Sequence, residues 1–392
     1  MKKISANFIF STNSALIANG VLITNDGGEV LDMLQNDDGL EDVLHYDGVL
    51  CPGFINSHCH LELSHLKGLL PAKQGLVNFL APVIDIRDAE REVIEDAMVS
   101  AEEEMMREGI VAVGDICNTA DSFRLKSKSS LRYHNYIEII APDPSRAETV
   151  FRNGEDLLNK SRDQGIPGSI VPHAPYTASR ELLNLIGEQG RTSAVPISIH
   201  NQESEHENTF FKDGSGPIRE LYTDHRNADL AYFEPPNMNS MQAAMIGLGE
   251  DLSILFVHNT YTTAKDISRA ESYPADVKYC LCPNANLYIE DRLPNLGLFI
   301  DKREDVMLGT DSLSSNWSLS ILDEMKAISS VFPEIDLSTL LTWSTINGAK
   351  FLGFHNELGT FEVGKKPGVN LLYDLDLDNL AITKDTKVRS LD

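Results

Sequence analysis

The sequence alternates between short apolar runs and helix-length segments, and this alternation limits the fold more than any other feature. Helix-like periodicity lies between the runs, for instance at 85–108, 179–188, 241–247 and 319–331. The runs, rich in branched and aromatic residues, number eight: 50–57, 110–117, 133–141, 168–174, 195–200, 252–258, 277–282 and 305–310. Strands that alternate with helices form a parallel sheet, and eight is the number that closes a barrel. The expected fold class is therefore α/β, with a (β/α)8 TIM-like barrel.

The rival architecture is a doubly wound open sheet. Such a sheet usually carries a glycine-rich phosphate loop after its first strand. Here the first run is followed by histidines, His58 and His60, and not by a glycine-rich loop. The barrel is therefore favoured over the open sheet.

Both ends of the chain differ from the middle. Residues 1–50 contain short β-rich stretches (ANFIFS, ALIANGVLIT, VLHYDGVLC) with a turn signal at Asn25–Gly28. Near the other end, DLSTLLTWSTINGAKFLGF predicts a helix, and GTFEVGKKPGVNLLYD predicts two short strands around a turn. Because both ends lie outside the barrel in sequence, we expect residues 1–52 and 356–392 to form one small β-sandwich domain, and residues 53–355 to form the barrel domain.

Composition excludes several kinds of partner. The 392 residues include 33 basic and 59 acidic side chains, for a net charge of −26. A surface this negative repels polyphosphates, so we expect no nucleic acid and no anionic membrane as partner, whereas a small nucleoside or base in a pocket is compatible with it.

Location is predicted from hydropathy and from the cysteines. No stretch approaches the roughly 18 apolar residues that a membrane span needs, and MKKISANFIF is too short and polar for a secretory signal. The five cysteines lack the spacing of a disulfide scaffold, which indicates a reducing compartment. Cys280 and Cys282 lie in an apolar run without a second cysteine pair, so we expect them to be structural. The protein is predicted to be cytoplasmic.

The first run leads into a His-x-His pair, in LCPGFINSHCHLE at 50–62. Side chains two apart on a strand point to the same side, so His58 and His60 project together and Cys59 points the other way. Two adjacent imidazoles on a rigid strand make half of a metal site. The alternative is a pair of solvated histidines beyond the strand end.

Polar residues also follow the other runs. Chemistry in a β/α barrel is located at the carboxyl ends of the strands. The residues at those ends are His58, His60, His173, His200, Glu203, His258, Asn284, Asn286 and Asp311. Five of the eleven histidines are in this group, whereas random placement would scatter them over helices and loops.

This group can supply a complete metal site. His58, His60, His200 and Asp311 offer three imidazoles and a carboxylate, which suit one Zn²⁺, with Fe²⁺ as the alternative. A water bound by such an ion is a nucleophile near neutral pH. Glu203 follows His200 by three residues and can lie beside the ion as a proton shuttle.

Several motifs together resemble the amidohydrolase superfamily, in its mononuclear deaminase and chlorohydrolase branch. They are PGFINSHCH, VPHAPYT, HNQE at 200–203, VHN at 257–259, CPNANL and LGTDSLSSNWSL, in the family's order from about residue 52 to 320. The resemblance implies that His58, His60, His200 and Asp311 bind the metal. It also implies that Glu203 protonates a ring nitrogen and that His258 with Asp311 handles the protons of the water.

The resemblance further implies that His173, Asn286 and Ser314 lie near the substrate. Dinuclear members of the superfamily carry a carboxylated lysine at the end of the fourth strand, and GSIVPHAPY has no lysine. A single metal is therefore expected. The implied reaction is attack of a metal-bound hydroxide on the amidine carbon of an aromatic ring, with release of ammonia.

The substrate implied by the resemblance is a small molecule of the adenosine type. VPHAPYT and HNQE resemble deaminases of S-adenosylhomocysteine, methylthioadenosine or aminodeoxyfutalosine. The motif HCHLE, which contains Glu62, favours the aminodeoxyfutalosine deaminases, and Glu62 would then bind the substrate. Glu62 as a solvated or ion-paired loop carboxylate is the alternative. A homodimer is the oligomeric state that the resemblance suggests.

Two other functions compete with deamination. One is hydrolysis of a different C–N or C–Cl bond, as in guanine, cytosine or a triazine. The other is a non-catalytic barrel that binds partners, which the complete set of site residues disfavours.

The segment from Glu203 to about Ser240 reads as a long irregular loop, typical of a lid or binding loop, with a plain surface insertion as the alternative. Of its three clustered glutamates, only Glu203 has the catalytic spacing. Glu205 and Glu207 are expected on the lid surface.

Overall fold

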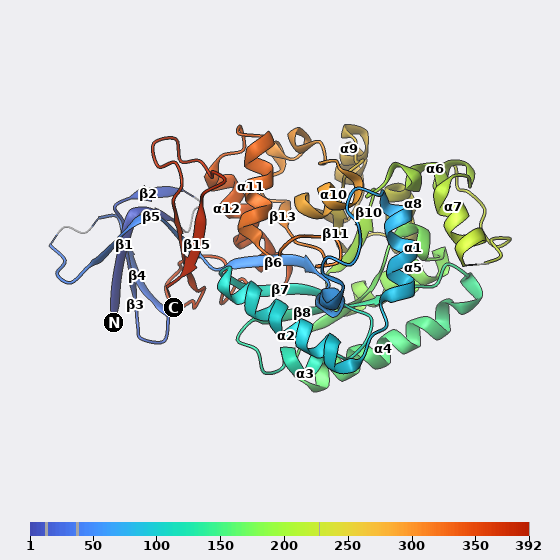
Figure 1. Ribbon diagram of the computed structural model, residues 1–392, viewed down its shortest axis with the longest axis horizontal. Coiled ribbons are helices and arrows are strands. Elements are labelled where there is room, and N and C mark those ends of the chain that lie inside the picture. The colour runs from blue at the N-terminus through green and yellow to red at the C-terminus, as the bar shows by residue number, and fades with distance from the viewer. Residues whose placement is uncertain (12–14, 37–38, 227, 392) are drawn as a thin grey trace.

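Eight parallel strands, in two four-stranded sheets, form the centre of the computed structural model, which describes residues 1–11, 15–36, 39–226 and 228–391 (Figure 1). The first sheet has the order β6 (Phe54–Cys59), β7 (Ile110–Cys117), β8 (Arg132–Ile139) and β9 (Gly168–Pro172). The second has the order β10 (Ile197–Asn201), β11 (Ser253–His258), β12 (Asp276–Leu281) and β13 (Val306–Leu308). Each predicted β-like run overlaps one of these strands, so the predicted alternation is confirmed.

The first predicted run, at 50–57, is shared between two strands. Residues 50–52 end strand β5 (Leu44–Pro52), and β6 begins at Phe54, so His58 lies inside its strand. Gly53 separates the two strands because no side chain fits there. An added Cβ would lie 2.2 Å from Val111 Cγ1 and 2.8 Å from the Pro367 carbonyl oxygen.

The edges of the two sheets meet on both sides. On one side, the amides of Thr310 and Asp311, just after β13, each donate to the His58 carbonyl of β6 at 3.0 Å. Asn56 Nδ2 also donates to Thr310 Oγ1 at 2.7 Å. On the other side, the His200 amide of β10 donates to the His173 carbonyl after β9 at 2.9 Å. These bonds bring the carboxyl ends of the first and last strands together.

Helices connect the strands, as the alternation predicts. Those between β6 and β10 are α1 (Leu76–Ile86), α2 (Arg91–Arg107), α3 (Phe123–Lys126), α4 (Ala147–Asp163) and α5 (Arg180–Ser193). Those after β10 are α6 (Glu205–Asp213), α7 (Pro217–Glu220), α8 (Ser240–Leu248), α9 (Ala264–Ser272), α10 (Pro283–Glu290), α11 (Ile321–Val331), α12 (Leu337–Ser344) and α13 (Ile346–Phe351). The predicted helix at 85–108 corresponds to α2 and the last residues of α1. The predicted helix after Val331 is divided at Thr345 into α12 and α13.

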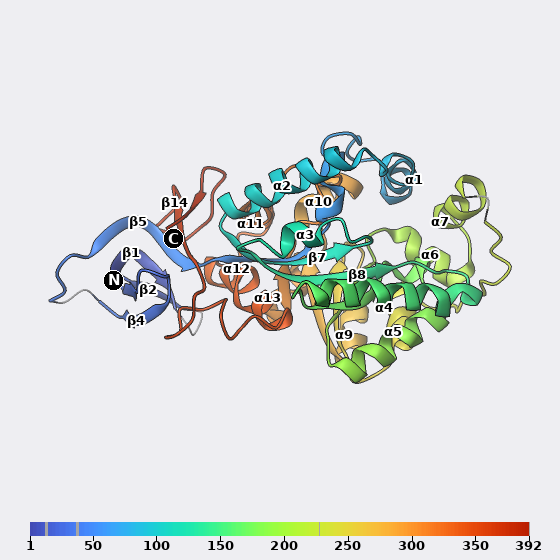
Figure 2. The same ribbon diagram turned by 90° about the horizontal axis from the view of Figure 1, so that it is seen from below.

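The segment 203–240 is not the irregular loop that the sequence predicts. It contains α6, α7 and a π-helical turn at Leu221–His225. Ser204 caps α6 with a capping box that includes Glu207, a local signal strong enough to start a helix. α7 lies at the end of the molecule far from both termini in both views (Figures 1 and 2).

The two chain termini share one sheet at the opposite end (Figure 1). Its strands are β1 (Lys2–Phe10), β2 (Leu16–Ala18), β3 (Val21–Thr24), β4 (Val30–Leu34), β5, β14 (Val369–Tyr373) and β15 (Lys387–Ser390). β5 pairs parallel with β1 and antiparallel with β14, which joins the two ends of the chain. The strand expected in GTFEV is absent from the described residues, and β14 is the one strand formed by that stretch.

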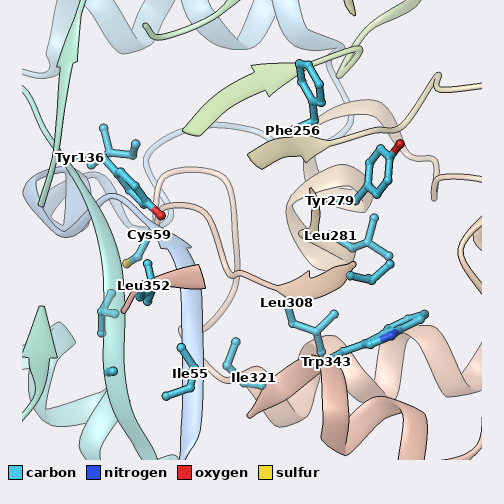
Figure 3. Close-up of a cluster of buried hydrophobic side chains, with 14 of the residues drawn as sticks. Ile55, Cys59, Tyr136, Phe256, Tyr279, Leu281, Leu308, Ile321, Trp343 and Leu352 are labelled. Carbon is cyan, nitrogen blue, oxygen red and sulfur yellow. The ribbon is translucent and has the colours of Figure 1, made fainter. Parts of the chain in front are cut away.

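The main core lies between the strands and their helices. Tyr136, Phe256, Leu308 and Trp343 are at most 1% exposed, and they come from β8, β11, β13 and α12 (Figure 3). Burial of each such side chain stabilises the fold by about 1.5–3 kcal/mol. All five cysteines are buried and free of disulfides, including Cys280 and Cys282. None of the helices in the described residues has the length and apolar character to cross a membrane.

Candidate metal centre

Four predicted metal ligands meet at the carboxyl ends of the strands. His60 Nε2 lies 3.2 Å from His58 Nε2 and 3.3 Å from His200 Nε2. Asp311 Oδ1 lies 3.1 Å from His60 Nε2 and 3.5 Å from His58 Nε2. One ligand atom from each of the four buried residues falls within 4.8 Å of the other three.

These spacings fit a tetrahedral cation. Bonds of about 2.0–2.1 Å to a tetrahedral Zn²⁺ place ligand atoms roughly 3.3 Å apart. Hydrogen bonding does not account for the cluster, because several ring nitrogens face one another within it. Three imidazoles and a carboxylate are also the donor set that zinc accepts. The chemistry and the spacing of the four residues therefore fit one divalent metal ion.

Neighbouring groups orient these ligands. His200 Nδ1 donates to the His173 carbonyl at 2.6 Å, which leaves Nε2 free to face the cluster. Ser315 Oγ donates to Asp311 Oδ2, which leaves Oδ1 facing His58 and His60. Ser315 has no part in the sequence-based assignment, which names Ser314.

Burial and charge set the protonation of the cluster. Burial lowers the pKa of His58 to about 4 and that of His200 well below its ordinary value. Burial opposes ionisation of Asp311, but hydrogen bonds from His58 and His60 outweigh it and hold the pKa of the carboxyl well below its usual range. Burial also lowers the pKa of His60, but Asp311 outweighs it and raises the pKa overall. His58, His200 and Asp311 therefore favour the forms that bind a cation, whereas the raised pKa of His60 means that this residue gives up a proton when a cation binds.

Glu203 and His258 lie beside the four ligands. Glu203 Oε1 is 3.7 Å from His258 Nε2, and both side chains are buried. His258 Nδ1 donates to Asn286 Oδ1 at 2.9 Å, so its Nε2 faces the site. Burial raises the pKa of the Glu203 carboxyl well above its ordinary value, and the charge of Asp311 raises it further. A glutamic acid of raised pKa can donate and accept protons near neutral pH.

The backbone at the strand ends is unusual. Gln202, His258, Asn259 and Asp311 have φ values of 45°, 72°, 57° and 57°. This left-handed conformation costs a residue with a side chain about 1–3 kcal/mol, and it persists where the surrounding structure enforces it. These four residues lie at or just after the ends of β10, β11 and β13, where the clustered side chains are located.

The expectation that Glu207 lies on the lid surface is wrong. It is fully buried, whereas Glu205 on the same helix is exposed. Its Oε1 accepts from the Glu203 amide at 2.8 Å, and its Oε2 accepts from the Gln202 amide at 3.0 Å. Glu207 therefore fixes the backbone that carries Glu203.

We expect Glu207→Gln to lower kcat by about 10- to 100-fold. The new amide group would face a backbone N–H in place of an acceptor oxygen, and misplacement of a catalytic group by 1 Å can cost about 100-fold. Steady-state kinetics and metal content of this variant and of the exposed Glu205→Gln test the expectation. Unchanged kcat in Glu207→Gln would contradict it, as would an equal loss in Glu205→Gln.

The same residue makes stability depend on pH. Burial raises the pKa of Glu207 to about 7, above the value of roughly 4.3 for glutamate in an unfolded chain. Between these values the folded protein binds more protons than the unfolded chain, so the free energy of unfolding falls as pH rises, by up to about 1.4 kcal/mol per pH unit. Urea unfolding at pH 5, 6 and 7 gives the free energy of unfolding at each pH. This free energy should fall less steeply with pH in Glu207→Gln than in the wild type.

A pocket opens over the cluster. The clustered residues His60, His200 and Asp311 line it together with Glu203, His258, His173 and Ser314. Leu63, Leu76, Phe79, Leu80, Val83, Ile84, Leu221, Tyr222 and Ile289 supply an apolar wall. An aromatic ring next to the cluster would therefore meet apolar side chains on one side and polar groups on the other.

Two predicted substrate-binding residues lie outside this lining. Asn286 is buried behind His258 and holds that ring. Glu62 is 8% exposed and accepts from the amides of Asn118 and Thr119, both at 3.1 Å, so it is neither a solvated loop residue nor part of the pocket wall.

Several lining residues escape the sequence analysis, namely Arg87, Asn118, Glu138, Tyr176, Thr177 and Arg226. Asn118 directly follows β7, and Glu138 is the penultimate residue of β8. Both therefore carry the same signal as the histidines, a polar residue at the carboxyl end of a strand.

A buried ion pair supports the loop after His60. Lys126 Nζ lies 2.5 Å from Asp115 Oδ2, and both side chains are fully buried. Asp115 Oδ1 accepts from the Leu61 amide at 2.8 Å. Lys126 also donates to Asn135 Oδ1 at 2.8 Å. The pair thereby joins β7, α3 and β8 to the backbone next to a candidate metal ligand.

Lys126→Met should lower the free energy of unfolding by about 3–5 kcal/mol, since it leaves the Asp115 carboxylate buried without its cation. Asp115→Asn together with Lys126→Met should recover part of this loss, because asparagine still accepts from the Leu61 amide. Chemical denaturation measures both variants against the exposed Lys128→Met. A loss below about 1 kcal/mol in Lys126→Met would contradict the assigned role.

Comparisons with known proteins agree with this architecture. A sequence profile of the amidohydrolase family matches residues 49–389. The chain is 26% identical to an aminodeoxyfutalosine deaminase of Deinococcus radiodurans, over 78% of this chain and 73% of that protein. It is 24% identical to a 5-methylthioadenosine/S-adenosylhomocysteine deaminase of Thermodesulfovibrio yellowstonii, over 94% and 84% of the two chains.

Solved structures share the fold. The aminofutalosine deaminase of Helicobacter pylori, in complex with methylthio-coformycin, superposes with a TM-score of 0.79 at 21% identity, covering 95% of this chain and 92% of that one. A zinc-bound adenosine deaminase of Xanthomonas campestris gives 0.74 at 20% identity, covering 97% and 88%.

Proposed function

Because the chain belongs to the amidohydrolase family, we propose that it is a metal-dependent aminohydrolase that deaminates an adenosine-type purine ring. The observation that carries the proposal is the convergence of three imidazoles and one carboxylate, with Glu203 and His258 beside them. Deaminase relatives at 24–26% identity support the reaction class. The substrate is a small molecule, of the aminodeoxyfutalosine, S-adenosylhomocysteine or methylthioadenosine kind.

His58, His60, His200 and Asp311 would hold one Zn²⁺ per chain. The spacing of their ligand atoms and the zinc-bound relative support this choice. When bound, such an ion lowers the pKa of water and so supplies a nucleophile near pH 7.

The protein side chains would then move the protons. Glu203 gives a proton to the ring nitrogen next to the amino-bearing carbon, which makes that carbon more electrophilic. His258, with Asp311, receives a proton from the attacking water. His258 then passes its proton to the exocyclic nitrogen, which leaves as ammonia. Glu203 takes back a proton from the hydroxyl group on the same carbon, which becomes the keto group, so water and the amidine balance with ammonia and the lactam. His173 and Ser314 would contact the substrate, and Asn286 would act on it through His258.

We also propose the domain organisation predicted from the sequence. The two four-stranded sheets would close into one (β/α)8 barrel over residues 53–355, with the bonds at both sheet edges as support. Residues 1–52 and 356–392 would form the composite β-sandwich domain. The separate apolar cluster of Ile9, Leu22, Leu50, Phe361 and Leu371 supports this second unit.

Ammonia release from a panel of compounds, with chloride release measured for the chlorotriazine, tests the proposed function. The panel consists of adenosine, methylthioadenosine, S-adenosylhomocysteine, aminodeoxyfutalosine, guanine, cytosine and a chlorotriazine, each tested with zinc-loaded protein. We expect equimolar ammonia and keto product from at least one adenosine derivative, with about one zinc per chain. Turnover of only the chlorotriazine, guanine or cytosine would overturn the substrate class. Two tightly held metals per chain would overturn the single-metal site.

A further inference from the structure

One buried carboxylate at the pocket has no part in the proposed reaction. Glu138 is the penultimate residue of strand β8 and lines the pocket, and its side chain is 4% exposed. Its Oε1 accepts from Asn118 Nδ2 at 2.9 Å. Its Oε2 is buried and accepts no hydrogen bond from the described residues. Buried charged oxygens are nearly always hydrogen-bonded, so an oxygen of this kind beside a pocket indicates a missing ligand.

The adjacent histidine does not satisfy this oxygen. His200 Nδ1 lies 3.8 Å from Glu138 Oε2, beyond hydrogen-bonding distance. That N–H already donates to the His173 carbonyl at 2.6 Å. Oε2 therefore keeps its full capacity to accept a hydrogen bond.

The side chain is held in place on its other flank. Asn118 donates through Nδ2 to both Oε1 and the backbone carbonyl of Glu138, at 2.9 and 3.2 Å. Arg87 Nη2 donates to Asn118 Oδ1 at 3.3 Å, which fixes the direction of the amide. Glu138 is thus oriented before any ligand arrives, and preorganised acceptors select ligands more sharply than mobile ones.

A second metal ion is a poor fit for this position. Glu138, His173 and His200 do bring three ligand atoms within 4.8 Å of one another. However, His200 uses Nδ1 for the His173 carbonyl and directs Nε2 to the first cluster. His173 Nδ1 is engaged by Thr177 Oγ1 at 3.1 Å. This leaves one carboxylate oxygen and one imidazole nitrogen, fewer than the three protein ligands of a typical zinc site.

We propose that Glu138 accepts a hydrogen bond from a sugar hydroxyl of the substrate and so selects a nucleoside over a free base. This inference rests on the proposed function, in which Glu203 meets the purine ring. Glu203 lies beside His258, and Glu138 lies beside His173. His200 neighbours both histidine rings, at centroid distances of 5.3 and 4.7 Å. A substrate whose ring reaches Glu203 therefore presents its attached sugar to the wall that contains Glu138.

The test compares two variants on nucleosides that differ only in hydroxyl groups. Wild type, Glu138→Leu and Glu138→Gln, all zinc-loaded, are assayed with adenosine, 2′-deoxyadenosine, 3′-deoxyadenosine and 2′,3′-dideoxyadenosine. Loss of one hydrogen bond to a charged group should lower kcat/KM of Glu138→Leu for adenosine by about 10- to 100-fold. The same variant should change kcat/KM for the dideoxy compound by less than about 3-fold, and Glu138→Gln should fall between wild type and Glu138→Leu.

Two results would overturn the assignment to a substrate hydroxyl. An equal loss on all four nucleosides would do so, and so would loss of zinc from Glu138→Leu, which would make Glu138 a residue that positions the metal ligands. Calorimetric titration with adenosine and dideoxyadenosine in a zinc-loaded Glu203→Gln background, with and without Glu138→Leu, separates this inference from the proposed deamination, since it needs no turnover. A hydroxyl-dependent affinity that Glu138→Leu abolishes supports the inference even if no ammonia is released. Equal affinities for the two nucleosides, or no binding of either when Glu138 is present, overturn it.

Discussion

Glu203→Gln is expected to lower kcat by about 100- to 10,000-fold while zinc content stays near one per chain. Glutamine has nearly the shape of glutamate but cannot pass a proton to a ring nitrogen. The side chain lies 3.7 Å from His258 and is not among the four clustered ligands, so the metal should remain bound.

Single-turnover kinetics and metal analysis of Glu203→Gln test this expectation. Glu205→Gln is the matched control, because Glu205 is exposed two residues away. Near-normal turnover in Glu203→Gln would remove Glu203 from proton transfer. Loss of zinc together with activity would make Glu203 a ligand instead of a proton carrier.

Asp311→Ala should remove both the metal and the activity. Asp311 supplies the one carboxylate of the cluster, with Oδ1 at 3.1 and 3.5 Å from two imidazole nitrogens. Without it the site is neutral and has three ligands. We expect zinc to fall below about 0.1 per chain after dialysis against a chelator, with kcat reduced by at least about 1,000-fold, since the activated water depends on the ion.

Metal content and thermal unfolding measure this effect. Added zinc should raise the Tm of metal-free wild type and leave that of Asp311→Ala unchanged, because a ligand stabilises only a protein that binds it. The exposed Asp301→Asn serves as the control. A zinc-dependent rise of Tm in Asp311→Ala equal to that of wild type would contradict the assigned role.

The strands and the histidine cluster could be predicted because their signals are local. A buried parallel strand is an apolar run bounded by polar residues, and a histidine directly after it lies at the catalytic end. The sequence therefore places His58, His60, His200 and Asp311 on strand ends, and the structure brings those four residues together.

Other features depend on contacts that a pattern does not contain. Glu207 reads as one of three clustered acidic residues, yet its partners are the amides of Gln202 and Glu203. The sequence signal that distinguishes Glu207 is its capping box with Ser204. The same capping box predicts helix α6 in a segment expected to be an irregular loop. Glu138 reads as a polar interruption of an apolar run. Its orientation depends on Asn118, which is 20 positions away.

The joint between β6 and β13 has a consequence for the timing of metal loading. Asn56 and Thr310, which bond to each other there, are 254 positions apart. The full ligand set exists only when nearly the whole central region has left the ribosome and its last strand has docked on its first. For the proposed zinc site, metal acquisition should therefore be a late event in biosynthesis, and metal occupancy of newly made chains would report how many of them have finished folding.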